Sequence, residues 1–375
     1  MKTLLVAGGS GGHLTPAVAL AENLQAQGPC LILSTERPMD RIFAASSPVE
    51  WVTVDLKKFT PLWRWLSPPY LVHQGRALRR IWSVVRQTRP DIVVGFGGYL
   101  SAAGIAVAKA AGLPAVIHEQ NLLPGRANRW LALLADAVAV SFPETRQHLS
   151  GGPKVEVTGN PLRPSFGQVG FKQARGAFGF DLERPVLLVM GGSQGSQAIN
   201  GLILAMWENQ PLEKRNQVQV LHLTGTQEAS RTEAAYRRLG LEARVYPFFH
   251  EMDLAFAAAT LAVSRAGATT ITEMIALQVP AILIPYPHAG SHQRANARWI
   301  EERSGAVVLE EAPLRGTSLD RNVEEEGLTP QRLWEKVQEI LFSPQRIAQM
   351  RQALGSCADG SAVDRLGNLV RRLVK

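Results

Sequence analysis

Near its start the chain reads Thr3-Leu4-Leu5-Val6-Ala7-Gly8-Gly9-Ser10-Gly11-Gly12-His13-Leu14-Thr15-Pro16. A short apolar run enters a glycine-rich turn, and a helical pattern follows from about Pro16 to Gln27. An apolar strand that leads through glycines into a helix is typical of a parallel sheet covered on both faces. This stretch therefore predicts the first strand–turn–helix unit of an α/β fold.

The same unit recurs twice along the chain, at residues 91–111 and again from Pro185, where the turn is Gly191 to Gly195 and the helix begins at about Gln197. Between them, residues 158–164 contain two prolines and no apolar period, which is typical of a hinge. We therefore expect two Rossmann-like, doubly wound parallel-sheet domains that face each other across a cleft. The pattern does not assign the last helix, from about Ala362, to either domain. A second strand is expected to end near Glu36, and further strand candidates are residues 115–117, 137–140, 155–157, 218–223, 261–263 and 281–284.

Composition and charge exclude several classes of protein. The 375 residues are 46% hydrophobic and 19% charged, which is globular rather than disordered composition. The net charge of +8 favours an anionic partner. Two cysteines provide neither a disulfide framework nor a cysteine-based zinc site. The apolar start is too short for a signal peptide, and the most apolar long window, Leu100 to Ile117, contains Lys109 and Pro114. We expect a cytoplasmic protein whose membrane contact, if any, is peripheral.

The glycine loops are candidate phosphate cradles, because each leaves backbone N–H groups at the positive end of a helix. For any one loop, a tight turn that binds nothing is an equally good interpretation. None of the three has the G-x-G-x-x-G spacing of a dinucleotide site, and no P-loop motif occurs. These absences disfavour an NAD-dependent oxidoreductase, and the lack of an Asp-x-Asp pair disfavours a metal–nucleotide site.

Seven motifs follow one another in order. They are Gly8-Gly9-Ser10-Gly11-Gly12-His13-Leu14-Thr15-Pro16, Gly97-Gly98-Tyr99-Leu100-Ser101, His118-Glu119-Gln120-Asn121, Gly159-Asn160-Pro161-Leu162-Arg163, Gly191-Gly192-Ser193-Gln194-Gly195, Arg265-Ala266-Gly267-Ala268 with Thr272-Glu273, and His292-Gln293 with Asn296-Ala297. Over nearly the whole chain this order resembles the UDP-N-acetylglucosamine:N-acetylmuramyl-(pentapeptide) pyrophosphoryl-undecaprenol N-acetylglucosamine transferases of glycosyltransferase family 28. Any one motif alone would be a weak signal.

The resemblance implies a GT-B fold with an N-terminal acceptor domain and a C-terminal UDP-GlcNAc domain. The acceptor domain would comprise residues 1–163 plus 360–375 and associate with the membrane, and the donor domain would comprise residues 164–359. The implied reaction is inverting transfer of N-acetylglucosamine to the 4-hydroxyl of the muramyl sugar of lipid I, giving lipid II for peptidoglycan and thus for cell shape and division. It implies neither a cofactor nor an essential metal. It places the protein at the cytoplasmic face of the inner membrane, near other cell-wall synthesis proteins.

Other functions stay open beside this one. A UDP-GlcNAc epimerase, or a GT-B transferase with a soluble acceptor, would keep the fold and change the reaction. An NAD-dependent oxidoreductase or a non-catalytic nucleotide sensor would belong to another class.

Two residues are candidates for the general base. His13 lies at a helix start, where the dipole disfavours the imidazolium form, although a bound diphosphate would act in the opposite direction. Glu119 ends a strand, where open α/β sheets place their ligands. The sequence leaves the choice between them open.

Binding residues are assigned by the resemblance. Ser193 and its neighbouring amides would hold the UDP phosphates, Glu273 the ribose and Gln293 the transferred sugar. The chain departs from the family pattern at Ala102-Ala103, at Gly290-Ser291 and at Asp55-Leu56-Lys57-Lys58-Phe59, and these departures weaken the expected contacts with the acceptor diphosphate and the donor sugar. The predicted UDP-GlcNAc-binding residues are Ser10, Gly11, Gly12, Asn121, Arg163, Ser193, Phe249, Ala268, Thr269, Thr270, Ile271, Thr272, Glu273 and Gln293; the predicted acceptor-binding residues are Gly97, Gly98, Tyr99 and Ser101.

A basic aromatic stretch runs from Lys57 to Arg89 and contains no acid. Basic residues are attracted to anionic lipid, and tryptophan favours the membrane interface. No nucleic-acid motif accompanies the stretch, so we expect a membrane surface rather than nucleic acid as its partner. The alternative is a solvated helix with Ile81 and Trp82 in the core. The predicted membrane-surface residues are Trp63, Trp65, Arg76, Arg79, Arg80 and Trp82.

Overall fold

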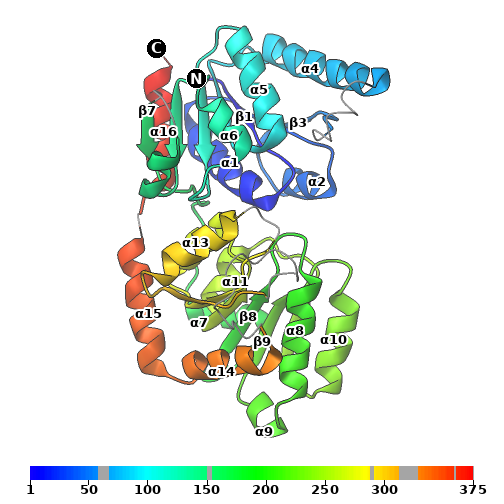
Figure 1. Cartoon of the computed structure of the whole chain (residues 1–375), viewed down its shortest axis with the longest axis vertical. Coiled ribbons are helices and arrows are strands. Elements are labelled where there is room, and N and C mark those ends of the chain that lie inside the picture. Colours follow the sequence, from blue (N-terminus) through cyan, green and yellow to red (C-terminus); the bar gives the residue numbers. More distant parts are fainter. Residues whose placement is uncertain (58–66, 150–153, 288–290, 312–327, 359, 375) are drawn as a thin grey trace, which may run out of the picture. The chain divides into compact units, whose positions relative to one another are not determined.

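The structure is a computed structural model, and it describes residues 1–57, 67–149, 154–287, 291–311, 328–358 and 360–374. The chain divides into two compact units, which are drawn in Figure 1. Unit 1 comprises Met1–Arg163 and Asp359–Lys375, and unit 2 comprises Pro164–Ala358.

Unit 1 contains a seven-stranded sheet in the order β3-β2-β1-β4-β5-β6-β7, with every pair parallel. The order reverses between β1 and β4, and open parallel sheets bind ligands at the carboxyl ends of the strands at such a point. The strands are β1 (Thr3–Val6), β2 (Cys30–Ser34), β3 (Glu50–Thr53), β4 (Ile92–Gly95), β5 (Ala115–Glu119), β6 (Ala137–Val140) and β7 (Lys154–Val157).

Helices cover both faces of this sheet. The buried side chains of α1 and α16 share one apolar cluster, and those of α4, α5 and α6 share another. The last helix, α16, packs against α1, and Figure 1 shows the two side by side although they lie at opposite ends of the chain. The helices of unit 1 are α1 (Gly11–Leu24), α2 (Pro38–Ala45), α4 (Pro68–Thr88), α5 (Gly98–Ala110), α6 (Arg126–Leu131) and α16 (Ala362–Leu373), with short 3-10 turns at Gln25–Gln27 and Pro143–His148.

Unit 2 repeats the plan with six parallel strands in the order β10-β9-β8-β11-β12-β13, which reverses between β8 and β11. Two apolar clusters fill the two faces of the sheet. The strands are β8 (Val186–Met190), β9 (Gln219–Leu223), β10 (Ala243–Tyr246), β11 (Leu261–Ser264), β12 (Ala281–Leu283) and β13 (Ala306–Val308). The helices are α7 (Phe171–Phe178), α8 (Gln197–Glu208), α9 (Leu212–Arg215), α10 (Ala229–Arg238), α11 (Met252–Ala258), α12 (Ala268–Leu277), α13 (His292–Glu301), α14 (Pro330–Leu341) and α15 (Pro344–Cys357).

The prediction of two doubly wound α/β sheets is confirmed, with two local differences. The first helix begins at Gly11 instead of Pro16, so that Gly11, Gly12 and His13 are helical. Glycine disfavours helices, and the sequence pattern therefore assigned these residues to the turn. The strands β3, β10 and β13 were not among the predicted ones; each lies at an edge of its sheet, where partly exposed residues break the apolar run.

Candidate active site

The first glycine loop of unit 1 is held by a carboxylate. Gly9, with φ of +82°, donates its N–H to Asp40 Oδ1 at 3.0 Å. Asp40 is buried at the start of α2, and its other oxygen accepts the N–H of Thr35 at 2.8 Å. The Gly9 amide is therefore occupied by a side chain of the protein. The sequence analysis did not single out Asp40, although an acid in the first turn of the helix after β2 was a usable signal.

His13 is the third residue of α1, and its Nδ1 lies 3.3 Å from the carbonyl oxygen of Gly8. A carbonyl oxygen only accepts, so this contact assigns the proton of a neutral ring to Nδ1 and the lone pair to Nε2. Burial lowers the pKa of His13, whereas the bond to Gly8 and the carboxylates of Glu119 and Asp40 act in the opposite direction. At neutral pH the ring is therefore neutral, with Nε2 able to accept a proton.

The second glycine loop lies against this ring. A Cβ atom on Gly97 would lie 3.2 Å from His13 Nε2, and one on Gly98 would lie 3.5 Å from His13 Cε1. Both glycines have positive φ, +97° and +76°, which other residues rarely adopt. The carboxyl ends of β1 and β4 thus bring His13, Gly97 and Gly98 together, and neither glycine places a side chain against the ring.

Tyr99 and Ser101, the other two residues of the predicted acceptor site, differ in their exposure. Tyr99 is half-buried, and the guanidinium of Arg37 lies 5.8 Å from its ring centroid. Arg37, which the sequence analysis did not select, also donates to the Gly9 carbonyl at 3.5 Å. Ser101 is fully buried, and its hydroxyl donates to the Val6 carbonyl at 2.8 Å. The prediction that Ser101 contacts the acceptor does not fit this geometry; its bond joins α5 to β1.

Glu119 ends β5 and is buried. Its Oε1 accepts the N–H of Asn121 at 2.9 Å and the side-chain amide of Asn121 at 3.2 Å. Its Oε2 accepts the N–H of Gly125 at 2.9 Å and the side-chain amide of Asn128 at 2.8 Å. Four donors therefore engage both oxygens of one carboxylate and fix the loop after β5. This geometry makes Glu119 an organiser of the loop, because each of its oxygens already accepts two hydrogen bonds from loop residues.

His118 precedes Glu119 and is buried. Its Nε2 lies 2.9 Å from the Gly159 carbonyl, which assigns the proton to Nε2, and its Nδ1 lies 3.1 Å from the side-chain nitrogen of Gln120. Burial lowers the pKa of His118 to about 4. The ring is therefore neutral at physiological pH and joins the loop after β5 to the segment at Gly159.

In unit 2 the third glycine loop, Gly191 to Gly195, leads into α8. Ser196 caps the helix: its Oγ accepts the N–H of Ile199 at 3.4 Å and a guanidinium N–H of Arg265 at 3.0 Å. Ser193 lies half-buried on the loop. This guanidinium places positive charge beside the partial positive charge of the helix end, and the carboxylate of Glu311 offsets part of it.

Arg265 follows β11 and is itself buried. It donates to the Ile284 carbonyl at 3.1 Å, forms an ion pair with Glu311 at 2.7 Å, and lies 5.3 Å from the ring centroid of Tyr286. Its side chain therefore joins the end of β11 to the start of α8, the helix that follows β8. The strand order of the sheet reverses between β8 and β11. The sequence analysis quoted its motif without giving it a role; an arginine directly after an apolar strand was the signal.

The other predicted donor residues also lie at the carboxyl end of this sheet. Residues 268–273 form the first two turns of α12, and Glu273 there is buried. Gln293 of α13 accepts the N–H of Tyr286 at 2.9 Å and that of Ala266 at 3.3 Å through its side-chain oxygen. Only its side-chain nitrogen could therefore donate to a sugar. The ring of Phe249 packs on Tyr246, with centroids 5.0 Å apart. The backbone of Phe249 is therefore the group that could contact the uracil of the donor.

The structure divides the predicted residues between the units. Ser10, Gly11, Gly12 and Asn121 lie in unit 1 beside His13 and Glu119. Arg163 also lies in unit 1, where it interacts electrostatically with Glu22 of α1; burial raises the pKa of Glu22, and Arg163 opposes that rise. Among the described residues, no group of three or more His, Cys, Asp or Glu side chains is arranged to hold a metal ion.

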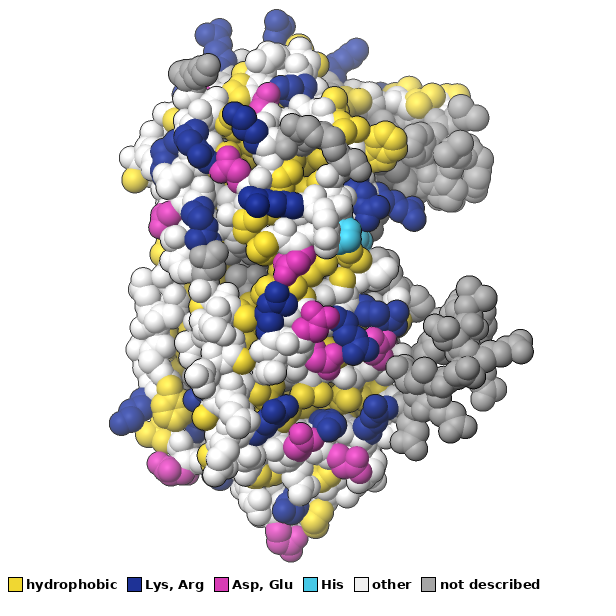
Figure 2. Space-filling view, turned by 60° about the vertical axis from the view of Figure 1, so that its left-hand side comes forward, with side chains coloured by type: hydrophobic (Ala, Val, Ile, Leu, Met, Phe, Trp, Pro, Cys, Tyr) yellow, Lys and Arg dark blue, Asp and Glu magenta, His cyan; other side chains and the backbone are white. Residues whose placement is uncertain are grey.

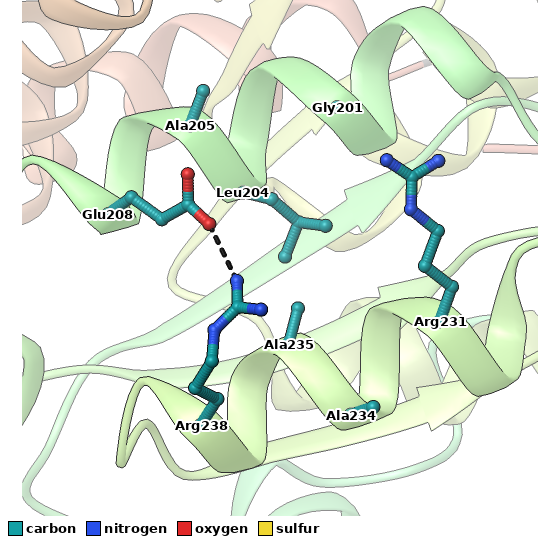
Figure 3. Close-up of a pocket in the computed structure, with 8 residues that line it drawn as sticks. All are labelled: Gly201, Leu204, Ala205, Glu208, Arg231, Ala234, Ala235 and Arg238. Atoms are coloured by element: carbon teal, nitrogen blue, oxygen red, sulfur yellow. Dashed lines mark hydrogen bonds and ion pairs between the residues drawn. The ribbon is translucent and has the colours of Figure 1, made fainter.

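A groove of about 380 Å³ lies between α8 and α10. Figure 3 shows Leu204 and Ala235 on the facing helices and the ion pair between Glu208 and Arg238, which measures 2.8 Å. No predicted site residue lines this groove. It is therefore separate from the candidate active site.

Two family descriptions match the chain. "Glycosyltransferase family 28 N-terminal domain" matches residues 3–140, and "Glycosyltransferase family 28 C-terminal domain" matches residues 186–365. The chain belongs to glycosyltransferase family 28. It is therefore a glycosyltransferase of the GT-B fold.

Full-length relatives agree with this assignment. The chain is 32% identical to the UDP-N-acetylglucosamine--N-acetylmuramyl-(pentapeptide) pyrophosphoryl-undecaprenol N-acetylglucosamine transferase of Moorella thermoacetica over 100% of both chains. It is 36% identical to the protein of the same name from Stutzerimonas stutzeri, over 88% of this chain and 91% of that one. The crystal structure of Acinetobacter baumannii MurG superposes with a TM-score of 0.70 at 26% identity over 99% of each chain.

A putative UDP-N-acetylglucosamine 2-epimerase from Listeria monocytogenes superposes with a TM-score of 0.71 at 14% identity, over 98% of this chain and 94% of that one. At that identity the likeness shows the fold alone. The fold is therefore shared by transferases and epimerases, and does not separate the two reactions.

Proposed function

We propose that this chain transfers N-acetylglucosamine from UDP-GlcNAc to lipid I, with inversion at the anomeric carbon, to give lipid II. The observation that carries the proposal is the arrangement of His13: its Nδ1–H donates to Gly8, and its Nε2 lies beside Gly97. The 4-hydroxyl oxygen of the muramyl sugar attacks C1 of the donor sugar, the bond from C1 to the diphosphate breaks, and Nε2 takes the hydroxyl proton. UDP leaves with the bonding electron pair.

We assign the stabilisation of the leaving diphosphate to unit 2. The N–H groups of the loop before α8 and the guanidinium of Arg265 would meet the charge that develops on the departing phosphate. Glu273, buried in the second turn of α12, would accept the ribose hydroxyls. Glu311 shares the Arg265 guanidinium, and this ion pair holds it in place before the donor binds.

Unit 1 would hold the acceptor. Gly97 and Gly98 leave space for a sugar beside His13, and Tyr99 lies next to them. Arg37, which lies over Tyr99 and beside Gly9, would add a positive charge for the acceptor diphosphate. Asp40 already occupies the Gly9 amide, so this loop has less capacity to bind an anion through its backbone.

We also propose that unit 1 binds the cytoplasmic face of the inner membrane through α4 and α6. On the described part of α4, Arg76, Arg79 and Arg80 are exposed, as are the apolar side chains of Leu71 and Leu78. The helix α5 packs against both α4 and α6, so these two helices flank it. Exposed apolar residues at α6 add to the surface: Trp130, Leu133 and Leu134.

The tryptophans chosen from sequence contribute less to this surface than expected. Trp63 and Trp65 lie outside the described residues. Trp82 is half-buried against the core beneath the guanidinium of Arg86, and Ile81 is fully buried. On the face that Figure 2 shows, Lys and Arg side chains are spread over both units instead of forming one patch. No helix among the described residues has the length and apolar character needed to cross a bilayer.

The activity is tested by incubating the chain with labelled UDP-GlcNAc and a lipid I analogue. We expect a labelled lipid product and loss of nearly all turnover in His13→Ala. A matched control is His148→Ala, in the 3-10 turn at Pro143–His148 of the same unit, which should keep its activity. Conversion of the free nucleotide sugar without the acceptor would instead indicate an epimerase.

Membrane binding is tested with vesicles that contain anionic lipid. The wild-type chain should sediment with them at low salt, and Trp130→Ser or a triple change of Arg76, Arg79 and Arg80 to Gln should weaken the binding. Each basic residue near such a surface contributes about 1 kcal/mol. Equal binding to neutral and anionic vesicles by all variants would contradict this part of the proposal.

A further inference from the structure

Behind the third glycine loop of unit 2 lies a chain of buried polar side chains from three elements. Tyr236 of α10 contacts His222 of β9 through its hydroxyl, 2.7 Å from Nδ1. His222 Nε2 lies 3.0 Å from Asn200 Oδ1 on α8, and Asn200 Nδ2 lies 2.9 Å from the Thr224 carbonyl. All of these side chains are buried, within a cluster that is otherwise apolar.

The acceptors fix the direction of every bond in this chain. The Thr224 carbonyl can only accept, so Asn200 presents its nitrogen there and its oxygen to His222. That oxygen can only accept, so His222 carries its proton on Nε2, and its Nδ1 accepts a hydrogen bond from the Tyr236 hydroxyl. Burial lowers the pKa of His222 to about 3, which keeps the ring neutral. Each polar group therefore has one arrangement that satisfies it.

This series of hydrogen-bonded side chains ends at the Thr224 carbonyl, directly beneath the glycine loop. A Cβ atom on Gly195 would lie 2.1 Å from the Thr224 carbonyl oxygen, and one on Gly225 would lie 2.5 Å from the Gln194 carbonyl oxygen. Both glycines have positive φ, +76° and +85°. The backbone of the loop is thus in close contact with the Thr224–Gly225 peptide. A shift of that peptide would displace the loop, because neither glycine leaves any gap between the two backbones.

We propose that His222 and Tyr236 are positioning residues for the donor diphosphate. They hold Asn200 in the orientation that fixes the Thr224 carbonyl, and this carbonyl sets the position of the loop whose N–H groups face the phosphates. A buried polar chain surrounded by apolar residues adds little to stability, since apolar side chains of the same size would also fill the space. It specifies one arrangement of the backbone instead. This inference rests on the proposed function of the loop as a UDP site.

The experiment measures the dissociation constant of UDP by calorimetry and the KM for UDP-GlcNAc and for a lipid I analogue. Two variants interrupt the hydrogen-bonded series: Tyr236→Phe removes one hydroxyl, and His222→Leu removes both bonds of the ring. A third, His222→Gln, can replace the donor to Asn200. The matched control is Val220→Ala, a buried apolar truncation two residues earlier on β9. Thermal melts report the loss of stability in each variant.

We expect Tyr236→Phe and His222→Leu to weaken UDP binding and to raise the KM for UDP-GlcNAc about 3- to 10-fold, as the loss of one hydrogen bond would. The KM for the acceptor should stay unchanged, and His222→Gln should recover part of the affinity. Val220→Ala should lower the melting temperature without changing either KM. Tyr236→Phe keeps the shape of the side chain, so it tests the inference even if His222→Leu does not fold.

Two results would overturn the inference, and they differ. If the wild-type chain binds UDP but Tyr236→Phe and His222→Leu bind it equally well, the polar chain is structural and the proposed function stands. If the wild-type chain does not bind UDP, the proposed donor site fails and the positioning role fails with it.

Discussion

The first and third glycine loops have the same strand–turn–helix geometry but opposite charges behind them. In unit 1 a buried carboxylate, Asp40, accepts the N–H of Gly9. In unit 2 a buried guanidinium, Arg265, donates to Ser196 at the start of α8. The first turn of α1 also contains His13, whereas the first turn of α8 contains no ionisable side chain.

This difference shows that a glycine loop alone does not define an anion site. The residue that follows a neighbouring strand decides whether the loop receives a negative or a positive partner. A carboxylate beside the first loop helps His13 to accept a proton, because a nearby negative charge raises the pKa of an imidazole. A guanidinium beside the third loop favours a phosphate. We therefore assign proton transfer to unit 1 and diphosphate binding to unit 2.

The largest effect expected is that of His13→Gln. A glutamine keeps a donor near Gly8 but cannot take the acceptor proton, so kcat should fall about 10²- to 10⁴-fold while the KM for UDP-GlcNAc stays unchanged. Burial lowers the pKa of His13 below its ordinary value of 6.5. The wild-type rate should therefore fall only below pH 6.5, where the ring becomes protonated. Rates measured from pH 5 to 8 check both points. A mutant that kept the acidic fall would show that another group is the base.

A smaller effect is expected for Arg265→Lys in the other unit. Lysine keeps a positive charge but cannot reach Ser196, Ile284 and Glu311 together. The KM for UDP-GlcNAc should rise at least tenfold, with the acceptor KM unchanged. Arg298→Lys, which alters an exposed arginine of α13, provides the control. Equal KM values for wild type and Arg265→Lys would remove Arg265 from the donor site.

Among the described residues, His118 of unit 1 and His222 of unit 2 are fully buried neutral histidines, with pKa values of about 4 and about 3. In the unfolded chain both titrate near 6.5, so between that pH and the folded pKa the unfolded state binds more protons. The stability that these two neutral histidines contribute is therefore fully present above pH 6.5, and it is lost as the pH falls toward their folded pKa values. At pH 5 each histidine should lower the free energy of unfolding by about 2 kcal/mol. Urea unfolding at pH 7.5 and 5 measures this loss, which His222→Gln should roughly halve.

The smallest effect expected is that of Asp40→Asn. Asparagine can still accept the Gly9 N–H but has no charge, so the pKa of His13 should fall further. The acidic limb of the rate should move to lower pH by a few tenths of a unit, with little change in kcat at pH 8. The pH profile of kcat/KM provides the measurement. A shift to higher pH would mean that Asp40 does not act on His13 through its charge.

The sequence predicted the two sheets because their central strands are buried on both faces and read as continuous apolar runs. It missed the edge strands β3, β10 and β13, whose partly exposed residues break that run, and it included the edge strand β7. For the proposed site, it selected His13 and the glycine loops, since these follow strands directly. It could not distinguish Glu119 from His13 as the base, because only the folded loop reveals the four donors on Glu119.

Other parts of the site depend on contacts between residues far apart in the chain. Asp40 lies 31 residues from Gly9, and Arg265 lies 69 residues from Ser196. No local pattern connects such pairs. Ser101 shows the opposite case: its motif suggested a ligand contact, but the fold buries its hydroxyl against Val6 of β1.

The central claim is the division of labour between the two loops, and equilibrium binding of UDP to three proteins tests it most directly. The account predicts that His13→Gln binds UDP as tightly as the wild-type chain and that Arg265→Lys binds it at least tenfold more weakly. Weakened binding in His13→Gln together with unchanged binding in Arg265→Lys would contradict it, because the diphosphate would then lie on the first loop.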